Sequence, residues 1–520
     1  MIHAPEAANL GVENGSTRDP SEYLGMTGDS RTSARVMESA MEVRPNYLNG
    51  EWVQGDGGET IEVVNPATGR VFAKVSSVTP GQVRQALTDA QGALGAWRKL
   101  PAKARADYLL AIAQELNRRS DDVARLMTQE NGKPLSQSQG EVAGSVDHLR
   151  WFAEECRRAY GRVIPHQAAG KRNLVMKMPV GVVGAVSPWN FPLILSVRKV
   201  APALAAGCPT ILKPASQTPL CNLAFAECCD AAKLPKGVFQ LINGPASMIG
   251  DEFLNNPICR KITFTGSTEV GQKLIVGAAK GVKKLSLELG GHAPVIVFDD
   301  ADLDRAVEGV LAAKFRNTGQ SCIAANRIYV QAGIYDRFVA AFVAKVKSLK
   351  TGDGLEGEQD VGPVVNEKAL SFALGQIEDA TRRGARVLAG GKRMDRPGFF
   401  LEPTVLVDVP DDAACMNEET FAPIAPIARF ERESEAIAKA NDSPFGLSAY
   451  AFTTNIDRMF RVAEQLEAGT IGINDGVPTT SNAPFGGFKH SGWGRELGSE
   501  GLDAFLETKH VSIGVIESSD

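Results

Sequence analysis

Three side chains in this sequence could together carry out nucleophilic catalysis, namely Cys322, Glu288 and Asn190. Cys322 follows a predicted helix end among small and polar residues, where a partly open loop could present a thiolate. Glu288 is a carboxylate in an apolar strand that ends in two glycines, so it must be solvated, paired or used as an acid or base. Asn190 lies between two prolines, which would fix its amide as an oxyanion donor. Each also has an ordinary structural reading, as a core cysteine or as a turn residue.

A dinucleotide site is suggested by one corner of the chain. The sequence has no GxGxxG fingerprint, and the segment 266–273, GSTEVGQK, lacks the GK[ST] ending of a phosphate-binding loop. However, the strand-like run KITFT ends at Gly266 and Ser267 before a helix-like segment. Glycine there would let backbone N–H groups at a helix N-terminus approach a pyrophosphate. An ordinary strand–turn–helix corner would show the same pattern.

The elements that would position these residues form two alternating regions. From 179 to 297 short apolar runs alternate with helix-like segments, which predicts βαβ units and a parallel sheet covered on both faces. A similar region follows from about 300 to 490. It opens with an amphipathic helix capped by aspartates and followed by Gly319. Upstream, YLNGEWV predicts a hairpin that turns at Asn49 and Gly50. The predicted fold class is therefore α/β with two domains.

Composition excludes several classes of protein. The chain has 520 residues, which is too long for one hydrophobic core, so we expect several. Its net charge is −5 and it has no basic block, so we expect no nucleic-acid site. Eight scattered cysteines without a CxxC pair disfavour disulfides and zinc and favour a reducing, cytoplasmic location. We expect no metal. Residues 180–212 are low in charge but interrupted by prolines, which indicates buried interior rather than a membrane span. Residues 1–45 are predicted to be a disordered tail without a targeting signal.

Seven motifs occur in an order that resembles the aldehyde dehydrogenase superfamily, from about residue 46 to 515. They are SPWNFP (187–192), KPAS (213–216), FTGSTEVG (264–271), LELGG (287–291), GQSC (319–322), EETFAP (418–423) and PFGGFKHSGWGRE (484–496). Within this family the chain is most similar to succinate-semialdehyde dehydrogenases, through segments such as ALAAGCPTILKPASQTP. The resemblance implies a fold with two parallel-sheet α/β domains and a small β oligomerisation arm.

The resemblance also implies roles for the three reactive side chains. Cys322 would attack the aldehyde carbon as a thiolate, and the oxyanion would be held by the Asn190 side chain and the Cys322 backbone N–H. Hydride transfer to a nicotinamide dinucleotide would leave a thioester. Glu288 would then activate water to hydrolyse it, with a pKa raised by its apolar strand.

By the same resemblance, a larger set of residues would bind the cofactor. It comprises Trp189, Asn190, Lys213, Pro214, Ala215, Ser216, Gly266, Ser267, Leu289 and Glu419. Relatives that prefer NAD often have a glutamate, which binds both ribose hydroxyls, where this chain has Ser216. Without that carboxylate a 2′-phosphate is not repelled, and Lys213 would favour it. We therefore expect NADP as the preferred cofactor, with NAD tolerated.

For the substrate, Arg198 and Arg316 match positions that bind a distant carboxylate in the closer relatives, and Thr479 falls where a hydroxyl completes that pocket. Arginine offers a fork of donors suited to a carboxylate. Alternatively, Arg316 could offset a helix dipole and Arg198 could form a surface ion pair. Glutarate or α-ketoglutarate semialdehyde is an alternative substrate. Glu288 argues against transfer of the thioester to coenzyme A, and the intact reactive residues argue against a catalytically inactive binding protein.

The resemblance further implies a division of the chain. Residues 46–159 and 179–297 would form the cofactor-binding domain, 298–490 the catalytic domain, and 160–178 with 506–515 an oligomerisation arm. An edge strand near the C-terminus would seek a partner, so we expect a homodimer or homotetramer. The chain departs from many relatives at Ala324, where a second cysteine would give a redox switch, and at Ala422, where glycine is usual.

Overall fold

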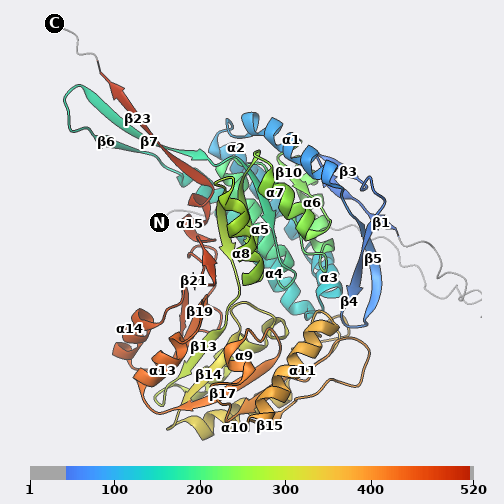
Figure 1. The fold of residues 1–520 in the computed structure, drawn as a ribbon, viewed down its shortest axis with the longest axis vertical. Coiled ribbons are helices and arrows are strands. Elements are labelled where there is room, and N and C mark those ends of the chain that lie inside the picture. Colours follow the sequence, from blue (N-terminus) through green and yellow to red (C-terminus); the bar gives the residue numbers. More distant parts are fainter. Residues whose placement is uncertain (1–41, 516–520) are drawn as a thin grey trace, which may run out of the picture. The chain divides into compact units, whose positions relative to one another are not determined.

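The computed structural model describes residues 42–515 (Figure 1). The predicted tail lies outside this part except for its last four residues, among which Val43–Arg44 forms strand β1. β1 pairs in parallel with β5, Arg70–Ser76, which also pairs with β4, Thr60–Asn65. The predicted end of the tail, residue 45, is therefore too late, because an ordered strand already begins at Val43. This three-stranded sheet was not predicted from the sequence.

The first large sheet has eight strands in the order β22-β12-β11-β8-β9-β10-β2-β3. The strands from β12 to β10 are parallel neighbours, whereas β22, β2 and β3 pair in the antiparallel sense at the two ends. Their bounds are β2 Asn46–Leu48, β3 Glu51–Val53, β8 Val182–Val186, β9 Thr210–Lys213, β10 Phe239–Leu241, β11 Cys259–Thr265, β12 Lys284–Glu288 and β22 Gly492–Trp493. The β2–β3 hairpin turns at Asn49 and Gly50, as predicted, and both residues have the positive φ of a type I′ turn.

Helices cover both faces of this sheet because its strands are apolar on both sides. One apolar cluster packs α1 and α7 against one face of the sheet. Another cluster packs the five helices from α2 through α6 against the opposite face. Val182 and Val183 belong to different clusters, since successive strand residues point to opposite faces. The helices are α1 Pro80–Trp97, α2 Ala102–Arg118, α3 Ser120–Asn131, α4 Leu135–Glu155, η1 Cys156–Arg158, α5 Pro192–Ala206, α6 Leu220–Ala231, α7 Ala246–Asn255 and α8 Thr268–Ala279.

The second large sheet has seven strands in the order β15-β16-β17-β14-β13-β19-β20, all parallel except β15. They are β13 Ala293–Val297, β14 Ala325–Gln331, β15 Arg386–Ala389, β16 Thr404–Val407, β17 Ile424–Phe430, β19 Ser448–Phe452 and β20 Thr470–Ile473. One face packs on α9 and α10, and the other on α11 to α14. These helices are α9 Leu303–Phe315, α10 Tyr335–Ser348, α11 Glu367–Arg382, α12 Ala414–Asn417, α13 Glu433–Asn441 and α14 Ile456–Gln465. β13 lies in this sheet, although the predicted boundary at residue 297 assigns it to the first region.

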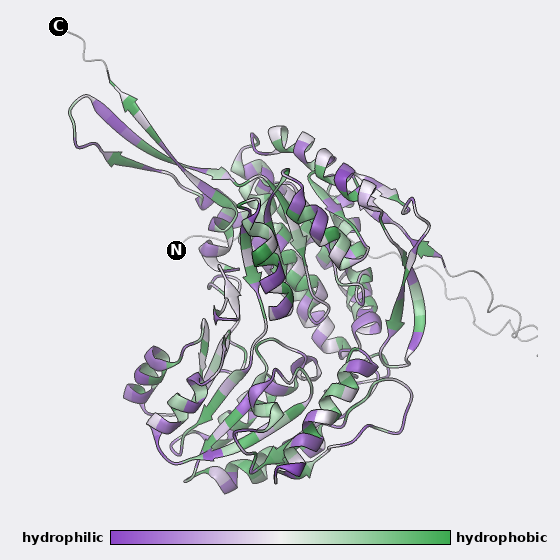
Figure 2. Ribbon diagram, in the orientation of Figure 1, coloured by the Kyte–Doolittle hydropathy of each residue, from purple (hydrophilic) through white to green (hydrophobic). Residues whose placement is uncertain are grey.

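The segments predicted as an arm form a third sheet, a three-stranded ribbon (Figure 1). It consists of β6, Arg162–Pro165, β7, Lys171–Pro179, and β23, Leu506–Gly514. β23 pairs with β7 along its whole length. Figure 2 shows apolar residues concentrated on the strands of the two large sheets and hydrophilic residues along the outer faces of the helices. Shorter elements complete the chain, namely β18 Phe445–Gly446, β21 Phe488–Lys489 and α15 Gly498–Asp503.

Candidate active site

Most of the predicted reactive and cofactor positions lie at one edge of the eight-stranded sheet. Strands β12, β11, β8 and β9 are parallel neighbours, so their carboxyl ends meet at that edge. Glu288 is the last residue of β12, Gly266 follows β11, Asn190 follows β8 and Lys213 is the last residue of β9. The parallel order thus brings together residues that are up to 98 positions apart, by the difference between 288 and 190.

Cys322 reaches this edge from the other large sheet and lies where two cavities meet. A cavity of about 260 Å³ is lined by Cys322 together with Arg198, Arg316 and Thr479, the three predicted substrate residues. A second cavity, of about 220 Å³, is also lined by Cys322. This second cavity is also lined by six of the predicted cofactor residues, namely Trp189, Asn190, Gly266, Ser267, Leu289 and Glu419. A thiol exposed to two cavities can react with a group bound in one while a partner binds in the other.

The Cys322 thiol lies in an environment that disfavours its ionised form. Burial raises its pKa to about 12, and the negative charges of Glu419 and Glu288 act in the same direction. The positive charge of Arg198 and a hydrogen bond from the backbone of Cys322 oppose them. In the protein without ligands the thiol is therefore protonated at neutral pH. The proton must leave before or during attack on an aldehyde.

Alkylation of Cys322 by iodoacetamide should accelerate with pH, about tenfold per unit from roughly pH 7 to pH 9, because only the thiolate reacts. A pKa raised to about 12 means that the thiolate is a small and steadily growing fraction throughout this range. Peptide mass spectrometry of quenched samples gives the rate at this cysteine. A rate that levels off near neutral pH would contradict the assignment of a buried, protonated thiol.

Asn190 is buried, and its side-chain Nδ2 donates a hydrogen bond to the backbone oxygen of Gln320 at 3.1 Å. Gln320 precedes the nucleophile by two residues, so this bond ties the amide to the loop that carries Cys322. An amide nitrogen carries two hydrogens, and the second one remains available to a ligand. The geometry is therefore compatible with the predicted oxyanion donor.

Glu288 is buried, and its Oε2 has no hydrogen-bond partner within residues 42–515. Burial raises the pKa of Glu288 well above its usual range, and the negative charge of Glu496 raises it further. Glu496 is held by Lys199, whose Nζ lies 2.5 Å from Glu496 Oε1 and 2.6 Å from Thr265 Oγ1. Such a carboxyl binds protons more tightly than an exposed one, which suits a general base once it is ionised.

Sequence reasoning missed the Lys199–Glu496 pair beside this carboxyl. A signal was present, since Arg198 and Lys199 are consecutive cations in the otherwise apolar helix α5. Buried cations need partners or a ligand. The partner of Lys199 lies 297 positions away in the sequence, so only the fold could identify it.

The cofactor side of the site offers donors suited to a dinucleotide. Ser267 caps the N-terminus of α8, where its Oγ accepts the Val270 N–H at 3.4 Å, and Ser267 itself lines the smaller cavity, so the positive end of the helix lies at this cavity. Lys213 is buried and forms no ion pair among residues 42–515, and burial lowers its pKa to about 8. Glu419 accepts a hydrogen bond from the Gly291 N–H at 3.0 Å, and burial raises its pKa to about 7. Lys213 ends β9 at the same sheet edge as the N-terminus of α8, and a buried cation without an ion-pair partner among the described residues fits a phosphate-bearing ligand. None of the four predicted cofactor residues Lys213, Pro214, Ala215 and Ser216 lines the smaller cavity.

The two predicted substrate arginines face the larger cavity without protein carboxylates. Arg198 is 7% exposed, has no ion pair in the described part of the chain and stacks on the Phe485 ring at 5.0 Å. The alternative of a surface ion pair is therefore wrong for Arg198. Arg316 directly follows α9 and lies over the Phe191 ring at 5.1 Å, also without an ion pair among these residues. The Thr479 hydroxyl is buried without a partner. These groups leave donors free for an anionic ligand.

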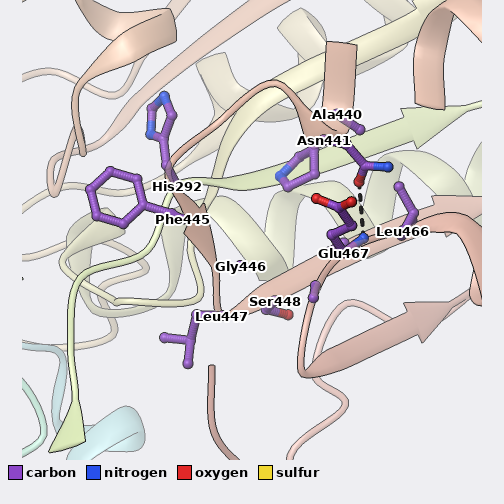
Figure 3. A pocket seen from close by; sticks show the side chains of 12 residues that line it. His292, Ala440, Asn441, Phe445, Gly446, Leu447, Ser448, Leu466 and Glu467 are labelled. Carbon is purple, nitrogen blue, oxygen red and sulfur yellow. Dashed lines mark hydrogen bonds between the residues drawn. The ribbon is translucent and has the colours of Figure 1, made fainter. Parts of the chain in front are cut away.

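A different hollow, near His292, cannot hold an aldehyde (Figure 3). Its volume is about 10 Å³, which is enough for a single water molecule at most. Figure 3 shows the Glu467 backbone N–H donating to Asn441 across this hollow, at 2.9 Å. Burial lowers the pKa of His292 to about 3, so the ring is neutral. This hollow therefore does not compete with the two cavities at Cys322 as a candidate site.

A thiol between two cavities, with a buried carboxyl and an amide donor nearby, suits covalent catalysis through a thioester. Residues 52–511 match the model of the aldehyde dehydrogenase family, and the chain belongs to this family, as its motifs predicted. None of the helices between residues 42 and 515 combines the length and apolar character that a membrane crossing requires.

Individual relatives agree with the family match. The chain is 50% identical to the succinate-semialdehyde dehydrogenase [NADP(+)] GabD of Escherichia coli, over 90% of this chain and 97% of that protein. It is equally 50% identical to a glutarate-semialdehyde dehydrogenase of Pseudomonas aeruginosa, with the same coverage. The crystal structure of succinate-semialdehyde dehydrogenase from Burkholderia pseudomallei superposes with a TM-score of 0.90 at 45% identity, covering 91% of this chain and 98% of that one. The predicted α/β fold class is confirmed.

Proposed function

We propose that this protein oxidises succinate semialdehyde to succinate with NADP, through a thioester on Cys322. The observation that carries the substrate is the pair of arginines, Arg198 and Arg316, which line the Cys322 cavity and have no carboxylate partner among the described residues. A substrate carboxylate would supply that partner through charge-assisted hydrogen bonds. The relatives named for succinate and glutarate semialdehydes support an ω-carboxylated aldehyde.

In the proposed reaction, Cys322 Sγ adds to the carbonyl carbon as its proton passes to solvent water, and the carbonyl oxygen becomes an oxyanion. The free N–H of the Asn190 amide and the Cys322 backbone N–H donate to that oxyanion, a donor of this kind contributing about 3 kcal/mol. Held by residues that line the smaller cavity, such as Gly266, Ser267 and Glu419, a nicotinamide dinucleotide would supply an acceptor for the hydride of the former aldehyde carbon. The remaining acyl group is a thioester on Cys322. Glu288 then takes a proton from water, and the hydroxide adds to the thioester carbon. The C–S bond breaks to release the acid, and the proton held by Glu288 passes to the Cys322 sulfur.

For the cofactor we propose NADP as the preferred form, with NAD tolerated. Ser216, three residues after Lys213, carries no charge that would repel a 2′-phosphate. Lys213 supplies a buried cation without a protein partner among the described residues. The relative named as NADP-dependent agrees with this preference. Parallel assays with the two cofactors measure it directly.

Glutarate semialdehyde, one carbon longer, is the second candidate because an equally similar relative is named for it. The two substrates carry the same aldehyde and carboxylate and differ in their separation. The ratio of kcat/KM values for the two aldehydes decides between them. A ratio above one for succinate semialdehyde is the expected result.

Replacing Arg316 by alanine should raise KM for succinate semialdehyde by about 30- to 100-fold, since hydrogen bonds to charged groups contribute about 2–3 kcal/mol. Turnover of an uncharged aldehyde such as propanal should be nearly unchanged. Steady-state absorbance of the reduced cofactor measures both. Arg305→Ala is the matched control, because Arg305 lies on α9, the helix that Arg316 directly follows, but is exposed and does not line the cavity. Equal losses on charged and uncharged aldehydes would rule out a carboxylate clamp at Arg316.

We also propose that the eight-stranded region holds the cofactor, that the seven-stranded region supplies Cys322, and that the ribbon of β6, β7 and β23 joins subunits. The support for the last point is that β23 pairs with β7 on one side and, among residues 42–515, has no strand paired to its other edge. Light scattering of the purified protein distinguishes a homodimer from a homotetramer. A cytoplasmic location is proposed because all eight cysteines are free thiols, which fits a reducing compartment.

A further inference from the structure

The backbone around Asn190 is held more firmly than a connecting loop needs to be. Its carbonyl oxygen accepts two hydrogen bonds, from Lys133 Nζ at 2.8 Å and from Asn317 Nδ2 at 2.7 Å. Its side chain donates to the Gln320 oxygen, as described above. Both ends of the residue are thus fixed by buried polar groups that belong to other parts of the chain.

Lys133 also forms an ion pair with Glu141, which holds the start of helix α5 in place. The ammonium of Lys133 and this carboxylate are both fully buried and lie 2.6 Å apart. The other carboxylate oxygen accepts the backbone N–H groups of Leu193 and Ile194, at 2.9 and 3.1 Å. These N–H groups belong to the first turn of α5, which begins two residues after Asn190. The pair therefore fixes the segment on the C-terminal side of the amide.

Asn317 comes from the turn that precedes the nucleophile. Asn317, Thr318 and Gly319 have φ values of 51°, 59° and 71°, three successive residues in the left-handed region. A threonine there is strained, whereas asparagine and glycine tolerate this conformation. The Asn317 amide also donates to the Gln320 oxygen at 3.1 Å. The strained turn thus places the Asn317 amide within hydrogen-bond distance of the Asn190 oxygen and of the Gln320 oxygen, which the Asn190 side chain also contacts.

We propose that Asn317, together with Lys133, is a positioning residue that aims the free N–H of Asn190 at the oxyanion formed on Cys322. One hydrogen of the Asn190 amide is engaged by the Gln320 oxygen, so its second hydrogen has a fixed direction. The clamp on the carbonyl prevents the residue from rotating away as the substrate enters. The inference rests on the proposed function, because it assigns Asn190 to oxyanion stabilisation.

A double-mutant cycle between Asn317 and Asn190 tests this inference. Asn317→Gly keeps the left-handed backbone but removes the amide, so we expect kcat to fall about tenfold, with KM for the aldehyde nearly unchanged. Asn190→Ala alone should lower kcat by about 100-fold or more. In the Asn190→Ala background, Asn317→Gly should cost less than about twofold, because its effect acts through Asn190. Asn317→Asp, which also lacks the amide donor, is the second variant and should behave in the same way.

Asn222→Ala is the matched control. Asn222 is a buried asparagine whose amide donates to the Pro192 oxygen at 3.2 Å and does not contact Asn190. Its replacement should lower Tm while kcat stays within about twofold of the parent value. Equal losses from Asn317→Gly in both backgrounds, or no loss in either, would overturn the inference and leave the proposed function intact. If Asn190→Ala keeps full kcat, the oxyanion assignment itself fails, and the inference fails with it.

Discussion

Cys322→Ala should lower dehydrogenase turnover by about 10⁴-fold or more, because removal of a covalent nucleophile removes the whole reaction path. Among the residues described, no other cysteine lines either cavity that meets at this position. The loss should appear in kcat with both NADP and NAD and with charged and uncharged aldehydes alike. Stopped-flow absorbance of the reduced cofactor should also show no burst in the first turnover.

Two controls separate this loss from unfolding. Cys229→Ala removes a thiol that is fully buried in α6, away from both cavities, and should retain turnover. Cys322→Ala should still bind the cofactor. Quenching of tryptophan fluorescence measures this binding, because Trp189 lines the cofactor cavity and is not altered in this variant. Turnover by Cys322→Ala above about 1% of the parent rate would exclude a Cys322 thioester as the main path.

Glu288→Gln is expected to stop the reaction after one turnover. Glutamine has nearly the same shape as glutamate but cannot accept the proton of water, so the thioester should form and persist. We expect a burst of about one reduced cofactor per site, followed by a steady rate lower by about 10²- to 10⁴-fold. Added hydroxylamine, which needs no base, should restore turnover by cleaving the thioester. Loss of the burst itself would contradict the assignment of Glu288 to hydrolysis.

The pH dependence of the parent enzyme should carry the same signature. Burial and Glu496 raise the pKa of Glu288, so the carboxyl stays protonated to a higher pH than an exposed glutamate. A protonated carboxyl cannot act as a base. Hydrolysis should therefore be slow below this raised pKa and become faster as the pH increases through it, and this acid limb should be absent from Glu288→Gln.

Motif order carried the prediction of family and fold class, since seven short motifs in one sequence order specify a fold far more strongly than periodicity does. Single residues were harder. Gly319 was expected to follow a simple helix end, but α9 ends at Phe315, and three left-handed residues, 317–319, come after Arg316. That turn depends on bonds from Asn317 to Asn190 and from Thr318 to Gly362, which are distant in sequence. No local pattern encodes them.

The boundaries between the two α/β regions could not be predicted from local sequence patterns either. β13 reads as the last strand of the first alternating region, yet it pairs with β14 and β19 of the second sheet. An apolar run is equally compatible with either sheet, and pairing partners decide its place. The same holds for β1, which is too short to show periodicity and is fixed by its pairing with β5.

Mass spectrometry of Glu288→Gln, quenched in acid after mixing with succinate semialdehyde and NADP, tests the central claim most directly. The account predicts that the peptide containing Cys322 gains the mass of one succinyl group, in an amount equal to the burst of reduced cofactor. Parent enzyme treated in the same way should carry little of the adduct, because it hydrolyses the thioester. Formation of reduced cofactor without an adduct, or with an adduct on another cysteine, would contradict a Cys322 thioester as the route to the acid.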